Sequence, residues 1–245
     1  MNVAFLGATK GMGRALARRM AERGDPLTLR ARKHGQPAYS PAVVGVPCGG
    51  AAPGHALCDL ERPETFGPAL DAAVDALGGL DAVVVTAGLF ATQDALESDR
   101  DLTRRLLTVD FAHTVLFCEE AKDRLLAAGG GKLCVFSSVA GERGRKPVIL
   151  YGASKAGLSA YLEGLDHKHR ADGLEVVTVK PGFVKTGMTA DLDPPPFAGE
   201  PEEVAGRVLA ALDRGAPVVY APIAWGPIMA VIRSLPRFVM RRVGF

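Results

Sequence analysis

The stretch "VAFLGATKGMGRALA", residues 3–17, decides the fold. Val3 to Leu6 is a short apolar run typical of a buried strand, and a helical pattern begins near Gly13. Glycines at 7, 11 and 13 lie between the two elements. They let the backbone turn tightly and approach a diphosphate, which the free N–H groups of a helix N-terminus attract. The stretch therefore predicts a nucleotide-binding turn, although the same glycines could merely pack a helix against a strand.

Apolar runs alternate with helical patterns along the rest of the chain. Further strands are expected at 27–29, 55–58, 81–88, 132–138, 174–179 and 216–222, and helices at about 61–79, 97–128, 150–169 and 201–215. Continuously apolar strands that alternate with helices indicate a parallel sheet covered on both faces. Residues 33–54 are rich in Pro and Gly, and predict a poorly formed helix or an irregular loop.

Composition narrows the class of protein. A chain of 245 residues, 48% of them hydrophobic, fits one large domain with a single core. The net charge of +2, without a basic cluster in the body of the chain, argues against nucleic acid. No apolar run of about 18 residues spans a membrane. No metal site is expected, because His167 and His169 would point to different faces of a helix.

The cysteines indicate the compartment. Cys48, Cys58, Cys118 and Cys134 are scattered, without a Cys-x-x-Cys pair, and three of them lie in or beside apolar runs. Buried reduced thiols are typical of a cytoplasmic protein. We therefore expect a cytoplasmic chain, peripheral on a membrane at most.

A second stretch, "LYGASKAGLSAYL" (150–162), carries the chemistry. On a helix, Tyr151 and Lys155 share one face. A tyrosine titrates near 10, and a nearby positive charge lowers its pKa, so Tyr151 could exchange a proton with a carbonyl oxygen. Ser138, at the carboxyl end of a strand, would hold that oxygen by a hydrogen bond. The small neighbours are expected to leave room for cofactor and substrate: Gly152, Ala153, Ser154, Ala156 and Gly157. The alternative is an ordinary tyrosine beside a surface lysine.

The spacing Gly-x-x-x-Gly-x-Gly of the first turn resembles the short-chain dehydrogenase/reductase family. Other elements of that family follow in order over nearly the whole chain: Asp59, "TAG" at 86–88, Ser138, Tyr151-x-x-x-Lys155 and "PGFVKTGM" at 181–188. The resemblance implies a doubly wound Rossmann-type α/β domain with a mostly parallel seven-stranded sheet at residues 1–222. An apolar, basic, helical tail would follow at 223–245. It also implies a nicotinamide-dependent oxidoreductase that forms a homo-oligomer.

Charge favours NADP(H) as the cofactor. In "LRARK" (29–33), Ala31 stands at the position where the family has an acidic residue that binds the ribose 2′-hydroxyl. Alanine cannot make that contact, whereas the positive charges of Arg32 and Lys10 suit a 2′-phosphate. Both cations could instead be solvated. The resemblance implies an adenine contact for Asp59, an adenosine contact for 86–88 and a nicotinamide contact for Thr186. The cofactor residues expected are Gly7, Thr9, Lys10, Gly11, Met12, Gly13, Arg32, Asp59, Leu60, Thr86, Ala87, Gly88, Tyr151, Lys155, Pro181, Gly182, Val184 and Thr186.

One expected catalytic position departs from the family pattern. Asp110 stands where asparagine usually helps a water and Lys155 to relay protons. An aspartate could steady the ammonium, but its charge opposes a phenolate. Thr86 likewise replaces an asparagine, so its hydroxyl would make the strand-to-helix hydrogen bond. The expected catalytic set is Ser138, Tyr151, Lys155 and Asp110, for NADPH-dependent reduction of a ketone. Alcohol oxidation with NADP⁺ and NADP binding without turnover stay open.

The last stretch, "APIAWGPIMAVIRSLPRFVMRRVGF" (221–245), contains no acidic residue. Pro227 and Pro236 suggest two short helices, while Arg233, Arg237 and Arg241, spaced by four, would share one side of a helix. Such a tail could rest on anionic lipid or cover an apolar substrate. It could equally pack on its own domain or on a partner subunit.

The tail also indicates which branch of the family the chain resembles. Together with "SSVAGERGRKPVILYGASKAGL" (137–158) and "VKPGFVKTGMT" (179–189), it resembles the branch containing decaprenylphosphoryl-2-keto-erythro-pentose reductase. This implies a carbonyl substrate that is bulky and apolar or lipid-linked. The loop with Arg143, Arg145 and Lys146 either meets a phosphate or is solvated.

Overall fold

The computed structural model describes the chain except for positions 29, 32–56, 191 and 245. The side chains of 30, 31 and 57 are also outside the description. The irregular segment expected at 33–54, the cofactor contact of Arg32 and the thiol of Cys48 therefore lie outside the described residues.

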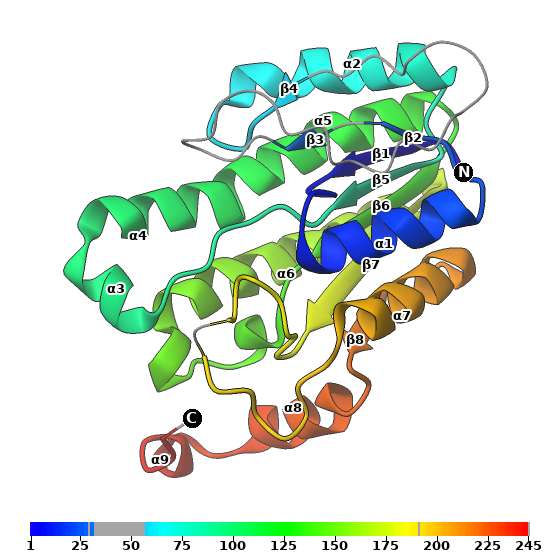
Figure 1. Cartoon of the computed structure of the whole chain (residues 1–245). Coiled ribbons are helices and arrows are strands. Elements are labelled where there is room, and N and C mark those ends of the chain that lie inside the picture. The colour runs from blue at the N-terminus through cyan, green and yellow to red at the C-terminus, as the bar shows by residue number, and fades with distance from the viewer. Residues whose placement is uncertain (29, 32–56, 191, 245) are drawn as a thin grey trace.

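A parallel sheet forms the centre of the molecule (Figure 1). Its six strands are, in spatial order, β2 (Leu27–Thr28), β1 (Val3–Leu6), β5 (Ala82–Val85), β6 (Gly131–Phe136), β7 (Leu174–Pro181) and β8 (Val218–Ala221). Every pairing is parallel, with Val3 opposite Ala82 in the first register. All residues of β1 and β5 are buried, which a sheet covered on both faces requires.

The strand count differs from the expected seven. The third strand of the chain, expected at 55–58, is described only as β4 (Leu57–Cys58), and it pairs in parallel with β3 (Arg30–Ala31). This pair forms a separate two-stranded sheet. The main sheet therefore has six strands among the described residues, and β2 and β3 are separated only by position 29, which is not described. The doubly wound α/β architecture is confirmed.

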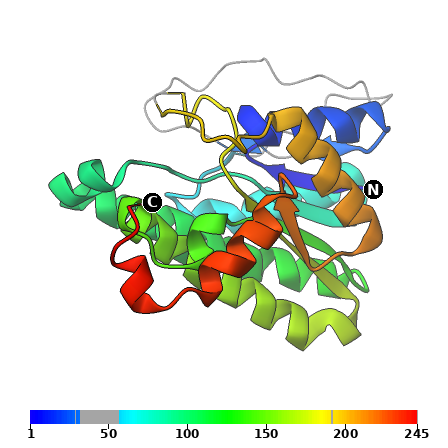
Figure 2. The same ribbon diagram turned by 90° about the horizontal axis from the view of Figure 1, so that it is seen from below.

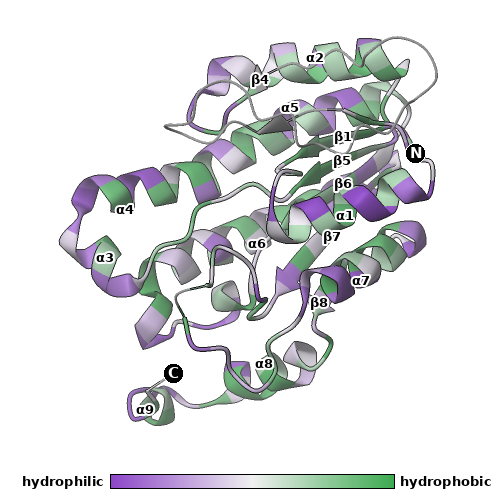
Figure 3. Cartoon of the chain, in the orientation of Figure 1, coloured by the Kyte–Doolittle hydropathy of each residue, from purple (hydrophilic) through white to green (hydrophobic). Residues whose placement is uncertain are grey.

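Helices cover the sheet in two layers (Figures 1 and 2). One layer contains α1 (Gly11–Glu22) and α7 (Pro201–Arg214), and the other contains α2 (Phe66–Leu77), α5 (Thr114–Ala127) and α6 (Ile149–His169). Neighbouring side chains of β1 enter opposite cores, since Val3 packs with the first layer and Ala4 with the second. The strands are correspondingly apolar at the centre of Figure 3. Within the described ranges, no helix has the length and apolarity needed to cross a bilayer.

The long helical segment expected at about 97–128 is interrupted. Two shorter helices, α3 (Gln93–Ser98) and α4 (Arg100–Leu107), precede α5 in this region. Elsewhere, a short helical turn, η1 (Pro63–Thr65), precedes α2. Asp99 separates α3 from α4 and accepts hydrogen bonds from the N–H groups of Asp101 and Leu102, which caps the new helix. Between α4 and α5 the chain forms a π-helical turn, η2 (Thr108–His113). Such turns often mark functional sites, and this one carries Asp110.

The tail forms two short helices, as its prolines suggested. These are α8 (Trp225–Ser234) and α9 (Arg237–Met240). Leu235 is extended before Pro236, which ends α8, so the expectation that Arg233, Arg237 and Arg241 share one side of a helix is wrong. Pro227 lies in the first turn of α8 and does not interrupt it.

Part of the tail packs on its own domain. Met229 and Ile232 are buried against Val139, and Tyr220 and Trp225 surround this small core. Val139 begins η3 (Val139–Glu142), the short helix that follows Ser138. The tail therefore contacts the segment that carries an expected catalytic residue.

The described cysteines are free and buried. Cys58, Cys118 and Cys134 form no disulfide. Burial, with a smaller contribution from Asp59, raises the pKa of Cys58 to about 12. At neutral pH this thiol is therefore protonated and unreactive.

Candidate active site

Ser138, Tyr151 and Lys155 meet at the carboxyl end of β6. Tyr151 lies in the first turn of α6, and the Nζ atom of Lys155 is 5.6 Å from the centre of its ring. Ser138 follows β6, and its hydroxyl is close enough to Tyr151 to lower the pKa of the phenol. The Ser138 hydroxyl also accepts the N–H of Ala140 at 3.1 Å, which orients it. A phenol, a hydroxyl and an ammonium thus converge where open α/β sheets bind ligands.

The pKa of Tyr151 lies above the ordinary value for a phenol. Burial is the largest cause and raises the pKa, while Lys155 and the hydrogen bond with Ser138 lower it and Asp110 raises it. The expected effect of Lys155 is present, but the expectation of a net acidified phenol is wrong in sign because burial outweighs the ammonium. Tyr151 is therefore protonated at neutral pH, the form that can donate a proton.

Asp110 is fully buried beside Lys155. Its Oδ1 accepts the N–H of Leu89 at 2.6 Å, and its Oδ2 lies 3.5 Å from the Nζ of Lys155. Burial raises the pKa of Asp110, against the effect of Lys155. The pKa of Lys155 lies above its ordinary value. Burial alone would lower this pKa, but Asp110 and Tyr151 together raise it by more, so the charged ammonium is favoured. The structure thus brings Asp110 into the same cluster as the other expected catalytic residues.

The glycines of α6 serve close packing. A Cβ atom on Gly152 would lie 2.8 Å from the carbonyl oxygen of Ala140, and one on Gly157 would lie 2.9 Å from the ring of Phe111. These positions let η3 and the π-helical turn press against α6. The expectation that both glycines leave room for cofactor and substrate is therefore wrong, because protein atoms already occupy those spaces.

The first glycine turn packs closely on its own neighbours and leaves the N-terminus of α1 uncapped. Gly7 has a φ of +106°, and a Cβ there would lie 2.5 Å from the N atom of Ala87. A Cβ on Gly13 would lie 2.2 Å from the carbonyl oxygen of Gly7. Lys10 precedes α1 without a side-chain cap, so the first N–H groups of the helix are free for an anion. These residues fit the diphosphate of a dinucleotide.

Neighbouring segments close around this turn. The Thr86 hydroxyl donates to the carbonyl oxygen of Gly7 at 3.0 Å, so it joins the end of β5 to the turn after β1 and not, as expected, to a helix. The methyl group of Thr186 is 3.2 Å from where a Cβ of Gly11 would lie. Residues 86–88 and the segment after β7 therefore both reach the glycine turn.

The other residues expected to bind the cofactor differ in how exposed they are. The Asp59 carboxylate accepts the N–H of Glu61 at 3.0 Å, and Val184 is 3% exposed, so contact with Val184 would involve its backbone. Thr9 and Lys10 are exposed beside the turn. Three residues pack within the protein: Met12, Leu60 and Pro181.

Glu142 was missed by the sequence analysis. It ends η3, four residues after Ser138, and its carboxyl group is 4% exposed. It pairs with Lys180 and Arg233 and accepts the Tyr220 hydroxyl at 3.2 Å. This carboxylate joins η3 to β7, β8 and α8, a contact between distant segments that no local pattern reveals.

Trp225 was also missed. A Cβ atom on Gly182 would lie 1.9 Å from the Nε1 of Trp225, so the indole packs directly on the backbone after β7. The same Nε1 donates to the carbonyl oxygen of Phe197 at 3.3 Å. Trp225 thereby links the tail to the segment between β7 and α7. Its being the single tryptophan of the chain was the one available signal.

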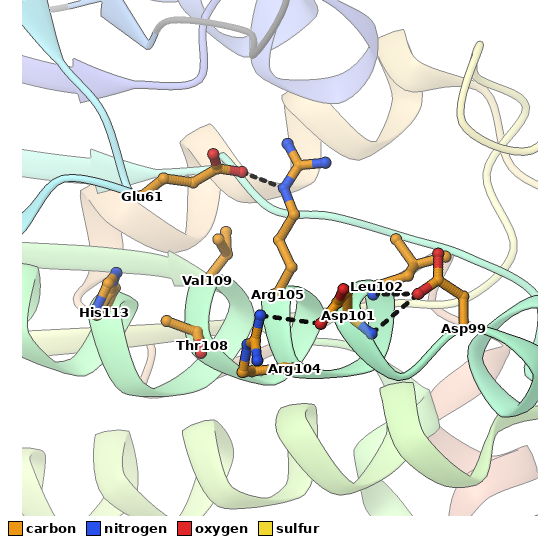
Figure 4. Close-up of a pocket in the computed structure, with 9 residues that line it drawn as sticks. All are labelled: Glu61, Asp99, Asp101, Leu102, Arg104, Arg105, Thr108, Val109 and His113. Carbon is orange, nitrogen blue, oxygen red and sulfur yellow. Dashed lines mark hydrogen bonds and ion pairs between the residues drawn. The ribbon is translucent and has the colours of Figure 1, made fainter.

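A separate open cavity of about 640 Å³ lies along α4 (Figure 4). Its charged side chains pair with each other: Arg105 with Glu61, and Arg104 with Asp101 at 2.9 Å. Its remaining lining residues are Asp99, Leu102, Thr108, Val109 and His113. None of the four expected catalytic residues lines it, so it is distinct from the candidate active site.

The fold and this cluster define a nucleotide-binding oxidoreductase. Residues 2–196 match the short chain dehydrogenase family, and the chain belongs to that family. An uncharacterized oxidoreductase of Mycobacterium tuberculosis strain H37Rv is 33% identical over 241 residues, covering 98% of this chain and 96% of the relative. Carbonyl reductase family member 4 of Xenopus tropicalis is 27% identical over 220 residues, with coverages of 86% and 90%.

A comparison with solved structures also finds a short chain dehydrogenase. A short chain dehydrogenase from Burkholderia cenocepacia J2315, crystallised in complex with NADP, superposes with a TM-score of 0.79 at 25% sequence identity. The match covers 98% of this chain and 96% of that one. The match therefore covers more of the chain than residues 2–196, which match the family.

Proposed function

We propose that the protein reduces a ketone to a secondary alcohol with NADPH, and that Tyr151 is the general acid. The observation that carries this proposal is the placement of Tyr151, in the first turn of α6, with the Nζ atom of Lys155 5.6 Å from its ring and with Ser138 at the carboxyl end of β6. A carbonyl oxygen needs such a proton donor when its carbon accepts a hydride.

NADP(H) would be held by the first glycine turn and its neighbours. The diphosphate fits the free N–H groups of α1, and Lys10 with Arg32 would pair with the 2′-phosphate. Residues 86–88 and Thr186 would contact the two nucleoside halves, and Lys155 the nicotinamide ribose. When bound, the reduced nicotinamide supplies the hydride.

The protein residues supply binding and the proton. Ser138 and Tyr151 hydrogen-bond the carbonyl oxygen, and Tyr151 gives its proton to that oxygen as the C–O double bond becomes a single bond. The Lys155 ammonium stabilises the phenolate that remains. Asp110 holds that ammonium in place, as its 3.5 Å contact supports. In reverse, the Tyr151 phenolate would accept the proton of an alcohol.

The proposed substrate is bulky and apolar or a lipid-linked keto sugar. Met188 and Phe197, in the segment between β7 and α7, are more than half exposed and offer apolar contacts. The motifs shared with the keto-pentose reductase branch support the same substrate class. The family resemblance also supports a homo-oligomer.

The tail is proposed to rest on an anionic membrane surface. Val231 and Phe238 are exposed apolar side chains, and Arg237, Arg241 and Arg242 are exposed cations nearby. V231S/F238S should lower the fraction of protein that sediments with phosphatidylglycerol vesicles. Equal sedimentation of variant and wild type would contradict this role.

The function is tested by following NADPH absorbance against a panel of ketones that includes lipid-linked keto sugars. Consumption of NADPH with formation of the alcohol supports the proposal. NADPH binding without turnover in either direction would instead support the alternative, an NADP-binding protein in which Asp110 has replaced the proton relay.

A further inference from the structure

A basic loop joins the two halves of the candidate active site. It contains Arg143, Arg145 and Lys146, and connects η3, after Ser138, to α6, which carries Tyr151. The loop leads through η4 (Lys146–Val148) directly into α6 at Ile149.

Two of the three cations hold the tail. The Nη2 atom of Arg143 donates to the carbonyl oxygen of Leu235 at 2.8 Å. The Nζ atom of Lys146 donates to the carbonyl oxygen of Arg241, also at 2.8 Å. The loop is therefore not simply a solvated basic segment.

Arg145 has no such partner. Its Nε is enclosed by protein and makes no hydrogen bond, and its guanidinium pairs with no carboxylate in the described part of the chain. Burial alone lowers the pKa of Arg145, with no acidic group to offset it. The other partly buried arginines of the described ranges, in contrast, each have a partner: Arg105, Arg124, Arg143 and Arg207.

The partly buried guanidinium carries a cost at its Nε, because the protein removes the water from that N–H group without replacing the lost hydrogen bond. A ligand with anionic oxygens would offset that cost. Guanidinium groups bind phosphate and carboxylate through paired N–H···O bonds, which are stronger than neutral hydrogen bonds.

The loop around Arg145 is held on both sides. At η3, a Cβ on Gly141 would lie 2.6 Å from the backbone of Lys155, so no side chain separates the loop segment from α6. On the other side, Arg143 and Lys146 attach the loop to the tail. Arg145 thus lies on a segment that contacts both α6 and the tail, between Ser138 and Tyr151 along the chain.

We propose that Arg145 binds an anionic group of the substrate, a phosphate or a carboxylate, at a distance from the reacting carbonyl. The proposal rests on the proposed function, since it names the substrate class of the same site. The ligand is a ketone that carries a negative charge, whether or not a lipid is attached to it.

The first test measures binding without turnover. Protein saturated with NADPH, so that the 2′-phosphate contacts are occupied, is titrated with inorganic phosphate by calorimetry. Arg145→Gln should weaken phosphate binding about ten- to a hundredfold, as expected for hydrogen bonds to a charged group. Arg214→Gln, an exposed arginine at the end of α7, is the matched control and should bind as wild type does. Equal phosphate binding by Arg145→Gln and wild type would overturn the proposal.

The second test separates the two anions and excludes a structural role. Ketones bearing a phosphate or a carboxylate are compared with their unphosphorylated or esterified counterparts. Arg145→Gln should lower kcat/KM for one anionic series about ten- to a hundredfold and leave the neutral ketones unchanged, with partial recovery in Arg145→Lys. An equal loss for charged and neutral ketones would reject the anion site.

The two proposals can fail separately. If no ketone is reduced but phosphate binding depends on Arg145, the anion site holds and the ketone reductase proposal fails. If ketones are reduced and phosphate binding does not depend on Arg145, the anion site fails alone. The melting temperature of Arg145→Gln should be at least that of wild type, because the substitution removes an uncompensated charge.

Discussion

The Oδ2 atom of Asp110 lies 3.5 Å from the Nζ atom of Lys155, inside the protein. The partner oxygen of the carboxyl group accepts the N–H of Leu89, so the side chain is held from two directions. Its negative charge raises the pKa of Tyr151, whereas the positive charge of Lys155 lowers it. The two residues therefore act on the phenol in opposite directions.

Asp110→Asn should lower the pKa of Tyr151, because it removes a charge that disfavours the phenolate. Reduction requires the protonated phenol, so the pH above which the rate of reduction falls should move to a lower value. Alcohol oxidation requires the phenolate, so its rise with pH should begin at lower pH. The pH profiles of kcat/KM in both directions measure this shift. Asp101→Asn, an exposed charge on α4, is the control, and a limit unchanged or moved upward by Asp110→Asn would contradict the assigned roles.

The contacts proposed for the 2′-phosphate predict which cofactor the protein prefers. Lys10→Ala and Arg32→Ala should each weaken the binding of NADPH about tenfold and leave the binding of NADH nearly unchanged, because only NADPH carries the extra phosphate. Fluorescence titration with both cofactors gives the two affinities. Arg14→Ala, on the exposed side of α1, controls for general charge loss. Equal losses for NADPH and NADH would reject the assignment.

Gly182 should not tolerate a side chain, since its Cβ would lie 1.9 Å from the Nε1 of Trp225. Gly182→Ala should cost about 1–3 kcal/mol of unfolding free energy as the indole is displaced. Denaturant unfolding gives that cost, and the emission of the single tryptophan reports the displacement directly.

Gly164→Ala is the matched control for that substitution. Gly164 lies in α6 with no atom within 4 Å of a Cβ, so alanine should stabilise the helix by about 0.5–1 kcal/mol. A Gly182→Ala variant with unchanged stability and emission would show that Trp225 does not pack on this backbone.

Glu142 should matter more to stability than any surface carboxylate. Glu142→Ala leaves Lys180 without its buried partner and frees Arg233, so it should cost about 3–5 kcal/mol. Glu202→Ala, which breaks the exposed pair with Arg18, should cost about 1 kcal/mol or less. Urea denaturation compares the two. Similar costs would mean that the Glu142 cluster does not hold α8 to η3.

Much of the fold could be predicted from periodicity. The run Val3–Leu6 is observed as a strand at those bounds, and the helix expected from 201 is α7. The site residues at strand ends could be predicted as well, since Ser138 follows β6 and Pro181 ends β7. Local apolar pattern and strand order suffice for these features, because the carboxyl ends of parallel strands share one edge of the sheet.

Other features depend on contacts between distant segments. The charge of Lys155 is visible in the sequence, but the desolvation that reverses the net pKa shift of Tyr151 is a product of packing. Gly152 and Gly157 look like empty space until η3 and Phe111 are placed against them. Arg145 likewise resembles its basic neighbours, and only the contacts of Arg143 and Lys146 with the tail distinguish it.

The most direct measurement of the central claim is rapid-mixing kinetics of Tyr151→Phe with NADPH and a ketone that the wild type reduces. Phenylalanine keeps the ring that packs against Phe90 and removes the proton. The variant should bind NADPH with wild-type affinity but oxidise it at least about a hundredfold more slowly. Hydride transfer at the wild-type rate would contradict the role of Tyr151 as the general acid.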